Sequence, residues 1–291
     1  MINTYDDIKA HPDTFKQLSV RDLLFVHYMC PQIKRLEQLY NHYNQFTFSL
    51  NGERILHQGG KSWKVTTQTS YFQRKTAYVQ EISNREGWEV LVFHIPDEFL
   101  IQFANEFMDN LSVKNLPELT NDMFIQVQLN EVTRTYFHSM IPYFKQKIPP
   151  SEKLLELKFK ELLLTILSNP SNKQLLSYIL HLSDDTKTPI WQIMEKNYTY
   201  NLCLKEFARI SSRSLAAFKR DFIDYYHTTP GKWLTNKRLK HTRLLLDTTK
   251  QSVSEIAFNS GFESSSHFSR IFKEKFGLSP LQFRKKQTNV V

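Results

Sequence analysis

The side chains with the clearest chemistry in this 291-residue sequence are two arginines in matching places of a repeated pattern. Arg220 stands two residues after Phe218, and Arg270 stands two residues after Phe268. On a helix that enters the major groove, a guanidinium can donate two hydrogen bonds to guanine, which discriminates against a wrong base by about 1–3 kcal/mol. These residue types favour recognition of a nucleic acid over catalysis.

The repeat extends beyond the arginines, at an offset of 50 residues. The segments FKRDF and FSRIF are each followed by a Ser/Thr-Pro pair, Thr229-Pro230 and Ser279-Pro280. Upstream, Leu204, Phe207 and Ala208 have the spacing of Val253, Ile256 and Ala257. Self-similarity of this kind indicates one supersecondary unit used twice.

Local signals predict the structure of this unit. Ser252 and Glu255 form a capping box that begins a helix, Gly261 permits a sharp turn, and Ser264 can cap a second helix. A short helix, a tight turn and a second helix make a helix-turn-helix. The pattern predicts such units at about residues 204–225 and 252–275. A helix over about 230–247 joins them, with Leu239, Thr242 and Leu246 facing inward.

The second helix of each unit presents small, polar or basic side chains on its outward face. In the first unit these are Arg213, Ala216, Ala217, Lys219, Arg220 and Ile223, and in the second they are Ser265, Ser266, Ser269, Arg270 and Lys273. Small and polar side chains allow close approach to base edges in a groove about 12 Å wide.

Positive charge is concentrated in the same part of the chain. Residues 187–291 contain 19 Lys+Arg and 8 Asp+Glu, a net charge of +11, whereas residues 1–186 contain 19 and 21, a net of −2. A basic domain beside a slightly acidic one indicates a polyanionic partner. Nucleic acid is the first candidate for this partner, and an anionic membrane surface is the second. The alternative is that the basic face is only solvated and binds no partner.

Several classes of protein are disfavoured by composition. The only two cysteines, Cys30 and Cys203, make neither a disulfide framework nor a zinc site and fit a reducing cytoplasm. No apolar run is long enough to span a membrane, and the first 20 residues do not resemble a signal peptide. We find no phosphate-binding glycine loop and no catalytic triad pattern, so we expect neither an enzyme nor a cofactor.

Histidines do not change this expectation. None of the four in the predicted strands and their loops has the spacing of a metal site, so we predict no metal and ordinary hydrogen bonds instead. These residues are His27, His42, His57 and His94.

Residues 1–182 are predicted to form one domain, with strands at about 20–96 and helices at about 97–182. Phe46, Phe48 and Leu50 alternate with polar residues, and Asn51-Gly52 predicts a hairpin turn before a return strand at 54–57. Further strands are expected at 63–67, 77–80 and 88–95. Short strands between turn signals are typical of a small barrel or sandwich. After Pro96 the period changes, and from about 121 to 182 the pattern is helical.

Two of these helices, separated by Pro149-Pro150, form a predicted hairpin whose apolar stripe has two interpretations. The stripe is a self-association surface, or it packs on its own barrel, and the pattern does not decide between them. Its residues are Phe137, Ile141, Phe144, Leu155, Phe159, Leu162 and Ile166. Residues 183–188 are the predicted linker to a second domain at 189–291.

Residues 187–286 resemble the DNA-binding domain of the AraC/XylS family of bacterial transcription regulators. The resemblance is strongest in SVSEIAFNSGFESSSHFSRIFKEKFGLSPLQFR, residues 252–284, and includes RSLAAFKRDF and TTPGKWLTNKRL. It implies two helix-turn-helix units, base-reading residues and phosphate contacts. The base-reading set is Arg213, Ala216, Lys219, Arg220, Ser265, Ser266, Ser269 and Arg270. The phosphate set is Ser214, Lys232, Lys237, Ser264, His267, Lys273 and Lys285.

The chain departs from the pattern at two positions. Cys203 stands where the second unit has its N-cap Ser252, which weakens that cap by about 1 kcal/mol. Ala216 is small for a base-reading residue, which puts base contact by the first unit in doubt.

The order and length of the first domain resemble the cupin-like barrel and helical hairpin of many such regulators. The resemblance implies an α+β protein whose first domain senses a small molecule or a protein and forms homodimers. The expected pocket residues are Trp63, Tyr71, Tyr78 and Trp88, with barrel core as their alternative role.

The resulting prediction is a cytoplasmic, sequence-specific transcription regulator. Its expected partners are double-stranded DNA, RNA polymerase and an effector, and it acts as an activator. The alternatives are a DNA-repair enzyme with a similar targeting domain and a protein that binds polyanions without sequence preference.

Overall fold

The computed structural model describes residues 1–30, 35–82, 87–107, 109, 111, 113–183 and 188–288. Internal contacts divide the chain into two compact units, residues 2–187 and residues 188–291 together with Met1. Most of the predicted linker, 183–188, lies outside the described residues. In the described part of the chain, no helix is long and apolar enough to cross a membrane.

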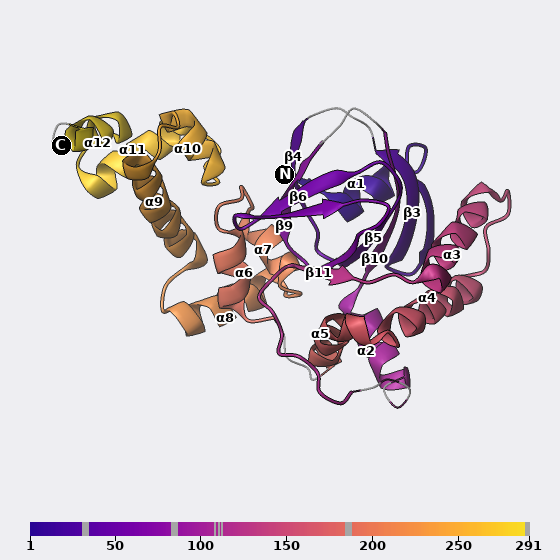
Figure 1. Cartoon of the computed structure of the whole chain (residues 1–291). Coiled ribbons are helices and arrows are strands. Elements are labelled where there is room, and N and C mark those ends of the chain that lie inside the picture. Colours follow the sequence, from indigo (N-terminus) through magenta and orange to yellow (C-terminus); the bar gives the residue numbers. More distant parts are fainter. Residues whose placement is uncertain are drawn as a thin grey trace. The chain divides into compact units, whose positions relative to one another are not determined.

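The first unit is a sandwich of two sheets (Figure 1). The six-stranded sheet has the order β11-β8-β5-β10-β3-β2, and the five-stranded sheet has the order β1-β4-β9-β6-β7. The strands are β1 (Ile2–Asn3), β2 (Lys16–Val20), β3 (Leu23–Cys30), β4 (Leu36–Tyr40), β5 (Asn44–Asn51), β6 (Arg54–Gln58), β7 (Lys61–Val65), β8 (Ser70–Gln73), β9 (Ala77–Glu81), β10 (Trp88–Ile95) and β11 (Phe124–Val127).

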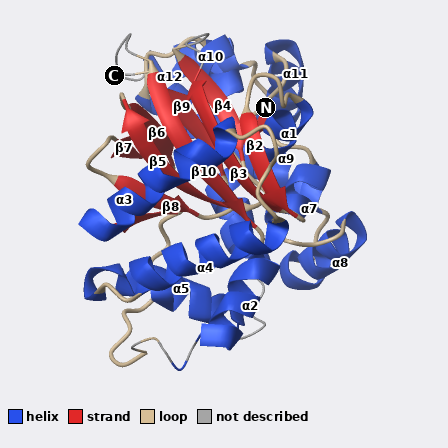
Figure 2. Cartoon of the chain, turned by 90° about the vertical axis from the view of Figure 1, so that its right-hand side faces the viewer, coloured by secondary structure: helices blue, strands red, loops and turns tan. Residues whose placement is uncertain are grey.

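Helices cover the outer face of the six-stranded sheet, so both faces of its strands are buried (Figure 2). Phe46 and Phe48 of β5 pack against Phe137, and their ring planes lie within 9° of parallel. Gln45 and Thr47 alternate with these rings and face the other sheet, because successive side chains of a strand point to opposite faces. The interior of the sandwich is therefore more polar than the layer under the helices.

The helices of this unit are α1 (Thr4–Ala10), α2 (Asp97–Phe107), α3 (Glu131–Met140), α4 (Glu152–Leu167) and α5 (Lys173–Ser183), with 3-10 turns at Ile141–Lys145 and Pro170–Asn172. The predicted hairpin corresponds to α3 and α4, which contact each other. Ser151 begins α4 by accepting a hydrogen bond from the Leu154 N–H at 3.3 Å.

The apolar stripe of this hairpin packs inside its own unit. Five of its seven side chains are buried in the core that α3 and α4 share with the sheet, and Ile141 and Phe144 are partly buried against it. A surface for a second copy needs exposed side chains. The assignment of these residues to dimerisation is therefore wrong, and the alternative interpretation holds. The buried five are Phe137, Leu155, Phe159, Leu162 and Ile166.

The hairpin predicted at Asn51-Gly52 is also wrong. β5 pairs with β8 and β10, whereas β6 belongs to the other sheet, so the turn carries the chain between sheets. Gly52 has a positive φ of 73°, but Asn51 does not, and a type I′ turn requires both. The two-residue hairpin lies at Gly59-Gly60, where both φ angles are positive and Gln58 pairs with Lys61.

A strand interrupts the region that was predicted to be helical throughout. β11 pairs antiparallel with β8 and extends the six-stranded sheet at its edge. Phe124, Ile125 and Val127 are buried there, and aromatic and β-branched residues pack well on a pleated surface. Four residues are too few for the helical period of the flanking sequence to reveal the change.

The second unit consists of helices in its described part. They are α6 (Ile190–Asn197), α7 (Leu204–Ile210), α8 (Leu215–Tyr226), α9 (Pro230–Thr248), α10 (Val253–Asn259), α11 (Ser265–Phe276) and α12 (Pro280–Thr288). Figure 1 shows α9 running from the group α6–α8 to the group α10–α12. The predicted fold class is confirmed: a β-sheet domain with a helical hairpin, and an all-α domain with two helix-turn-helix units.

Candidate DNA-binding surface

The second helix-turn-helix is fixed by reciprocal capping and by an aromatic core. Ser252 Oγ accepts from the Glu255 N–H at 3.1 Å, and the Glu255 carboxylate accepts from the Ser252 N–H at 2.7 Å. These hydrogen bonds lower the pKa of Glu255. Phe268 and Phe272 of α11 are fully buried against α9 and α10. Their burial sets which face of α11 remains outside.

The first unit repeats this construction with one altered cap. The Glu206 carboxylate accepts from the Cys203 N–H at 2.6 Å, so half of the capping box is kept although cysteine replaces serine. Ser212 occupies the turn at a φ of 52°, where the second unit has Gly261 at 83°. Both units therefore turn through a left-handed residue, which glycine adopts more easily than serine.

Helix α9 is tied to the loop before α7 by a buried arginine. Arg238 Nε donates to the Tyr198 carbonyl and Nη2 to the Tyr200 carbonyl, each at 2.7 Å. Burial lowers the pKa of Arg238 to about 10. The inward residues predicted for this helix, Leu239, Thr242 and Leu246, are all buried. The two recognition helices are thus connected through one packed helix.

Arg220 and Arg270 lie on the exposed faces of α8 and α11. Their side chains are 71% and 63% exposed, and each contacts an acidic neighbour on its own helix. Arg270 Nη1 is 2.8 Å from Glu274, four residues along, and Arg220 Nη2 is 3.3 Å from Asp221. Exposed pairs of this kind contribute only about 0.3–0.5 kcal/mol. Both guanidinium groups can therefore leave these partners for DNA at little cost.

Arg213 is placed differently from the other predicted base-reading residues. Its side chain is only 8% exposed, and Nε donates to Asp221 Oδ2 at 3.0 Å. Nη1 donates to the carbonyls of Thr188 and Ser211 at 3.1 and 2.9 Å. This placement argues against a base contact, because the guanidinium would have to abandon three partners. We therefore assign Arg213 to the support of the turn.

The remaining predicted base-reading residues lie on the outer faces of the two helices. Ala216 and Lys219 are exposed on α8, and Ser266 is exposed on α11. Ser265 and Ser269 are half-buried, and the Ser269 hydroxyl donates to the Ser265 carbonyl at 2.8 Å. The side chains on the first turn of α11 are thus short, which permits close approach of the helix to a DNA groove.

The predicted phosphate contacts surround these faces, with one exception. Ser214 and Ser264 cap α8 and α11 by accepting from the N–H groups of Ala217 and His267. Lys237 is paired with Glu195 at 2.8 Å and lies over the Tyr198 ring, so it already has a partner. The others are exposed, namely Lys232, His267, Lys273 and Lys285.

Comparison with known proteins agrees with this construction. A family model described as a helix-turn-helix domain matches residues 207–286, and the ExsA N-terminal regulatory domain matches residues 44–178. The virulence regulon transcriptional activator VirF of Yersinia enterocolitica is 28% identical over 81% of this chain and 89% of its own. The thermoregulatory protein LcrF of Yersinia pestis is 27% identical over 87% of this chain and 96% of its own.

The chain is thus similar over most of its length to AraC-type transcription regulators. It is a DNA-binding transcription regulator, as they are. Among solved structures, ToxT of Vibrio cholerae matches with a TM-score of 0.39 and 14% identity, over 90% of this chain and 97% of that one.

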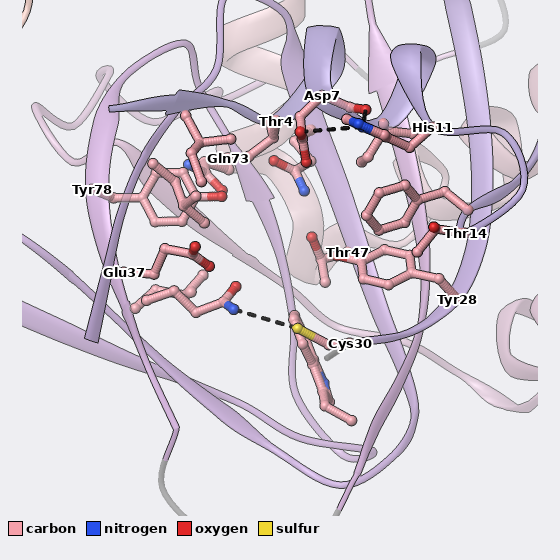
Figure 3. A pocket seen from close by; sticks show the side chains of 18 residues that line it. Thr4, Asp7, His11, Thr14, Tyr28, Cys30, Glu37, Thr47, Gln73 and Tyr78 are labelled. Atoms are coloured by element: carbon pink, nitrogen blue, oxygen red, sulfur yellow. Dashed lines mark hydrogen bonds and ion pairs between the residues drawn. The ribbon is translucent and has the colours of Figure 1, made fainter. Parts of the chain in front are cut away.

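The regulator also contains a cavity of about 310 Å³ between its two sheets and α1 (Figure 3). Of the four aromatic residues predicted to line a pocket, Tyr78 and Trp88 do so. Trp63 instead stacks on Phe124 at 4.5 Å, and Tyr71 packs at the edge of the same core. Trp63 and Tyr71 therefore have the alternative role, that of core residues, here in a sandwich of two sheets rather than a barrel.

Sequence reasoning missed the polar lining of this cavity. Gln45, Gln73 and Gln80 project into it from β5, β8 and β9, and Glu37 does so from β4. The alternation of polar and apolar residues on these strands was the available signal. Alternation alone does not show whether the polar face meets solvent or a second sheet, because the helices that cover the opposite face could not be placed.

Proposed function

We propose that the regulator activates transcription by placing α8 and α11 in two adjacent major grooves on one face of the DNA. Successive major grooves on one face lie about 34 Å apart. A single packed helix, α9, fixes the separation of the two recognition helices, as such binding requires. The observation that carries the proposal is the repeated exposure of Arg220 and Arg270 at equivalent places of the two units.

Within this proposal, residues divide into two groups by the information they read. Arg220, Arg270 and Lys219 contact bases, as do small residues of both helices, Ala216, Ser265, Ser266 and Ser269. The exposed lysines and the helix N-termini contact phosphate, which adds affinity but little discrimination between DNA sequences. Arg213 belongs to neither group, because its guanidinium is held within the unit.

The test is footprinting on the regulator's own promoter region, followed by binding of the variants Arg220→Ala and Arg270→Ala. We expect protection of two adjacent grooves per monomer. Each variant should lower the specific affinity by about 1–3 kcal/mol, roughly 5- to 150-fold, with little change in non-specific affinity. Arg35→Ala is the control, because that arginine is 83% exposed and lies in the first unit. An unchanged ratio of specific to non-specific affinity for Arg270→Ala would exclude α11 as a reading helix.

The names of the relatives support an activating role. VirF bears the name of an activator and LcrF that of a thermoregulatory protein, and the regulator shares most of its length with both. We infer that it works in the cytoplasm, contacts RNA polymerase, and is controlled through its first unit by an effector or by formation of a homodimer. Transcription in vitro with purified polymerase tests the activating role, and a repressed or unchanged promoter would contradict it.

A further inference from the structure

The cavity of the first unit is enclosed by residues from many elements. Asp7 and His11 come from the N-terminal segment, Tyr28 and Cys30 from β3, and Tyr78 from β9 (Figure 3). In the same view Gln73 and Tyr78 lie across the cavity from Tyr28 and Thr47. The apolar part of the lining includes Phe15, Leu39, Leu56 and Trp88. Pockets of about 300–1,000 Å³ with such mixed walls are typical sites for small molecules.

One buried hydrogen-bond donor of the cavity lining, Gln73 Nε2, lacks a well-formed partner among the described residues. Gln73 is 2% exposed, and its Nε2 makes no hydrogen bond of good geometry within the described residues, although the Tyr78 hydroxyl lies beside it. Burial raises the pKa of both Tyr28 and Tyr78, so their hydroxyls remain protonated and able to donate. Buried donors without acceptors are rare and costly, and they indicate a missing partner.

Arg54 adds a positive charge behind the same wall. It is fully buried on the face of β6 that it shares with the cavity-lining Leu56, and its guanidinium lies 5.3 Å from the centre of the Trp88 ring. Nη1 donates to the Glu53 carbonyl, whereas Nε and Nη2 make no hydrogen bond of good geometry with a described residue, although the Cys30 thiol lies beside the guanidinium. The carboxylate of the neighbouring Glu53 is paired with Lys64 instead, at 2.9 Å. A buried cation without an anion is strongly unfavourable.

Glu37 supplies the opposite charge. Its side chain lines the cavity from β4, is half-buried, and forms no ion pair with any described residue. The other carboxylate of the lining, Asp7, is already paired with His11 at 3.4 Å. The walls thus offer a carboxylate as well as unsatisfied donors and a cation, and they do not neutralise each other.

We propose that this cavity binds a small zwitterion of the amino-acid type with an apolar or aromatic side chain. Its carboxylate lies toward the end of the cavity behind which Arg54 is buried, its ammonium group toward Glu37, and its side chain against the apolar wall. A ligand of this class brings the acceptors that the buried donors lack and the cation that Glu37 lacks. The proposal deepens the control through the first unit that is proposed above.

The test measures binding to the full-length protein without DNA, so that it succeeds or fails independently of promoter recognition. Thermal unfolding is followed with each of the common L-amino acids at millimolar concentration. At a hundred times its Kd, a ligand should raise the Tm of its unit by about 5–10 °C. L-phenylalanine is compared with 3-phenylpropionate, which lacks the ammonium group, and 2-phenylethylamine, which lacks the carboxylate. We expect calorimetric titration to show at least tenfold weaker binding for each analogue than for the best amino acid.

Two variants test which residue recognises the carboxylate of the ligand and which recognises its ammonium group. Arg54→Met should leave the ligand-free Tm equal or higher, because it removes a buried charge, and should abolish the ligand-induced rise. Glu37→Gln should weaken binding of the amino acid while leaving 3-phenylpropionate unaffected. Arg35→Met and Glu118→Gln are exposed controls that should change neither quantity. The proposal is overturned if no amino acid raises the Tm, if an analogue binds as tightly as the amino acid, or if Arg54→Met keeps the ligand-induced rise.

Discussion

Replacement of Gly261 by alanine should destabilise the second unit severely. Gly261 forms the turn of the second helix-turn-helix at a φ of 83°. An added Cβ would lie 2.9 Å from the Thr199 carbonyl oxygen and 2.9 Å from Arg238 Nε. Carbon atoms do not approach other heavy atoms this closely in folded proteins. The turn therefore has to move away from the loop that Arg238 holds.

The magnitude has two parts. A left-handed conformation costs an alanine about 1–2 kcal/mol relative to glycine. Loss of one hydrogen bond from the buried Arg238 guanidinium adds about 1.5–3 kcal/mol, because its donor is charged. Together these give about 3–5 kcal/mol. In a unit of this size each kcal/mol lowers the Tm by about 4 °C or more, so the fall should exceed roughly 10 °C.

The equivalent turn of the first helix-turn-helix offers a matched control. Ser212 is exposed and adopts a φ of 52°, so Ser212→Gly relieves left-handed strain and should leave the Tm unchanged or slightly raised. Differential scanning calorimetry of the full-length protein measures both variants. A fall of less than about 3 °C for Gly261→Ala would refute the steric reasoning, because strain in the backbone alone predicts more.

Three further outcomes are expected. Burial lowers the pKa of His94 to about 3, below its ordinary 6.5, so acid favours the unfolded state. The free energy of unfolding should therefore fall by up to about 1.4 kcal/mol per pH unit as the pH drops from 6.5 toward 3, and urea titrations should show a shallower fall for His94→Leu. Phe159→Ala should destabilise the first unit by about 3–5 kcal/mol in the same titrations, since Phe159 is fully buried against Phe25 and Phe93; a loss below about 1 kcal/mol would contradict its place in the core. Lys273→Ala should weaken binding similarly at specific and random DNA. The slope of log affinity against log salt concentration should fall by about the contribution of one phosphate contact, whereas a change confined to one sequence would indicate a base contact.

The second unit could be predicted in detail because its signals are local. The capping pair Ser252 and Glu255, the turn at Gly261 and the buried Phe268 each act within a few residues of sequence, and the repeat supplies a second copy of each. The misplacement of Arg213 has a different origin. Its outward position was inferred from the helix alone, but it lies just before α8, where the Thr188 and Ser211 carbonyls and Asp221 converge.

The first unit was predicted less well because its strands pair over long distances. Asn51-Gly52 was interpreted as a hairpin turn from its residue types, yet β5 and β6 lie in different sheets. The choice between a turn within a sheet and a crossing between sheets depends on β8 and β10, which follow β5 by tens of residues. Register and pairing are set by such distant partners and by the face that becomes buried.

The same dependence explains why the cavity escaped prediction and what its polarity implies. In an ordinary sandwich the apolar face of each strand points at the other sheet. Here Phe46 and Phe48 point outward under α3, and Gln45 and Thr47 point inward. The helical layer therefore buries the rings of β5 that an ordinary sandwich places between its sheets. The space between the sheets still contains a buried apolar cluster that includes Leu24, Leu56 and Val90, so that only part of it has polar walls, and that part can keep a donor such as Gln73 for a ligand.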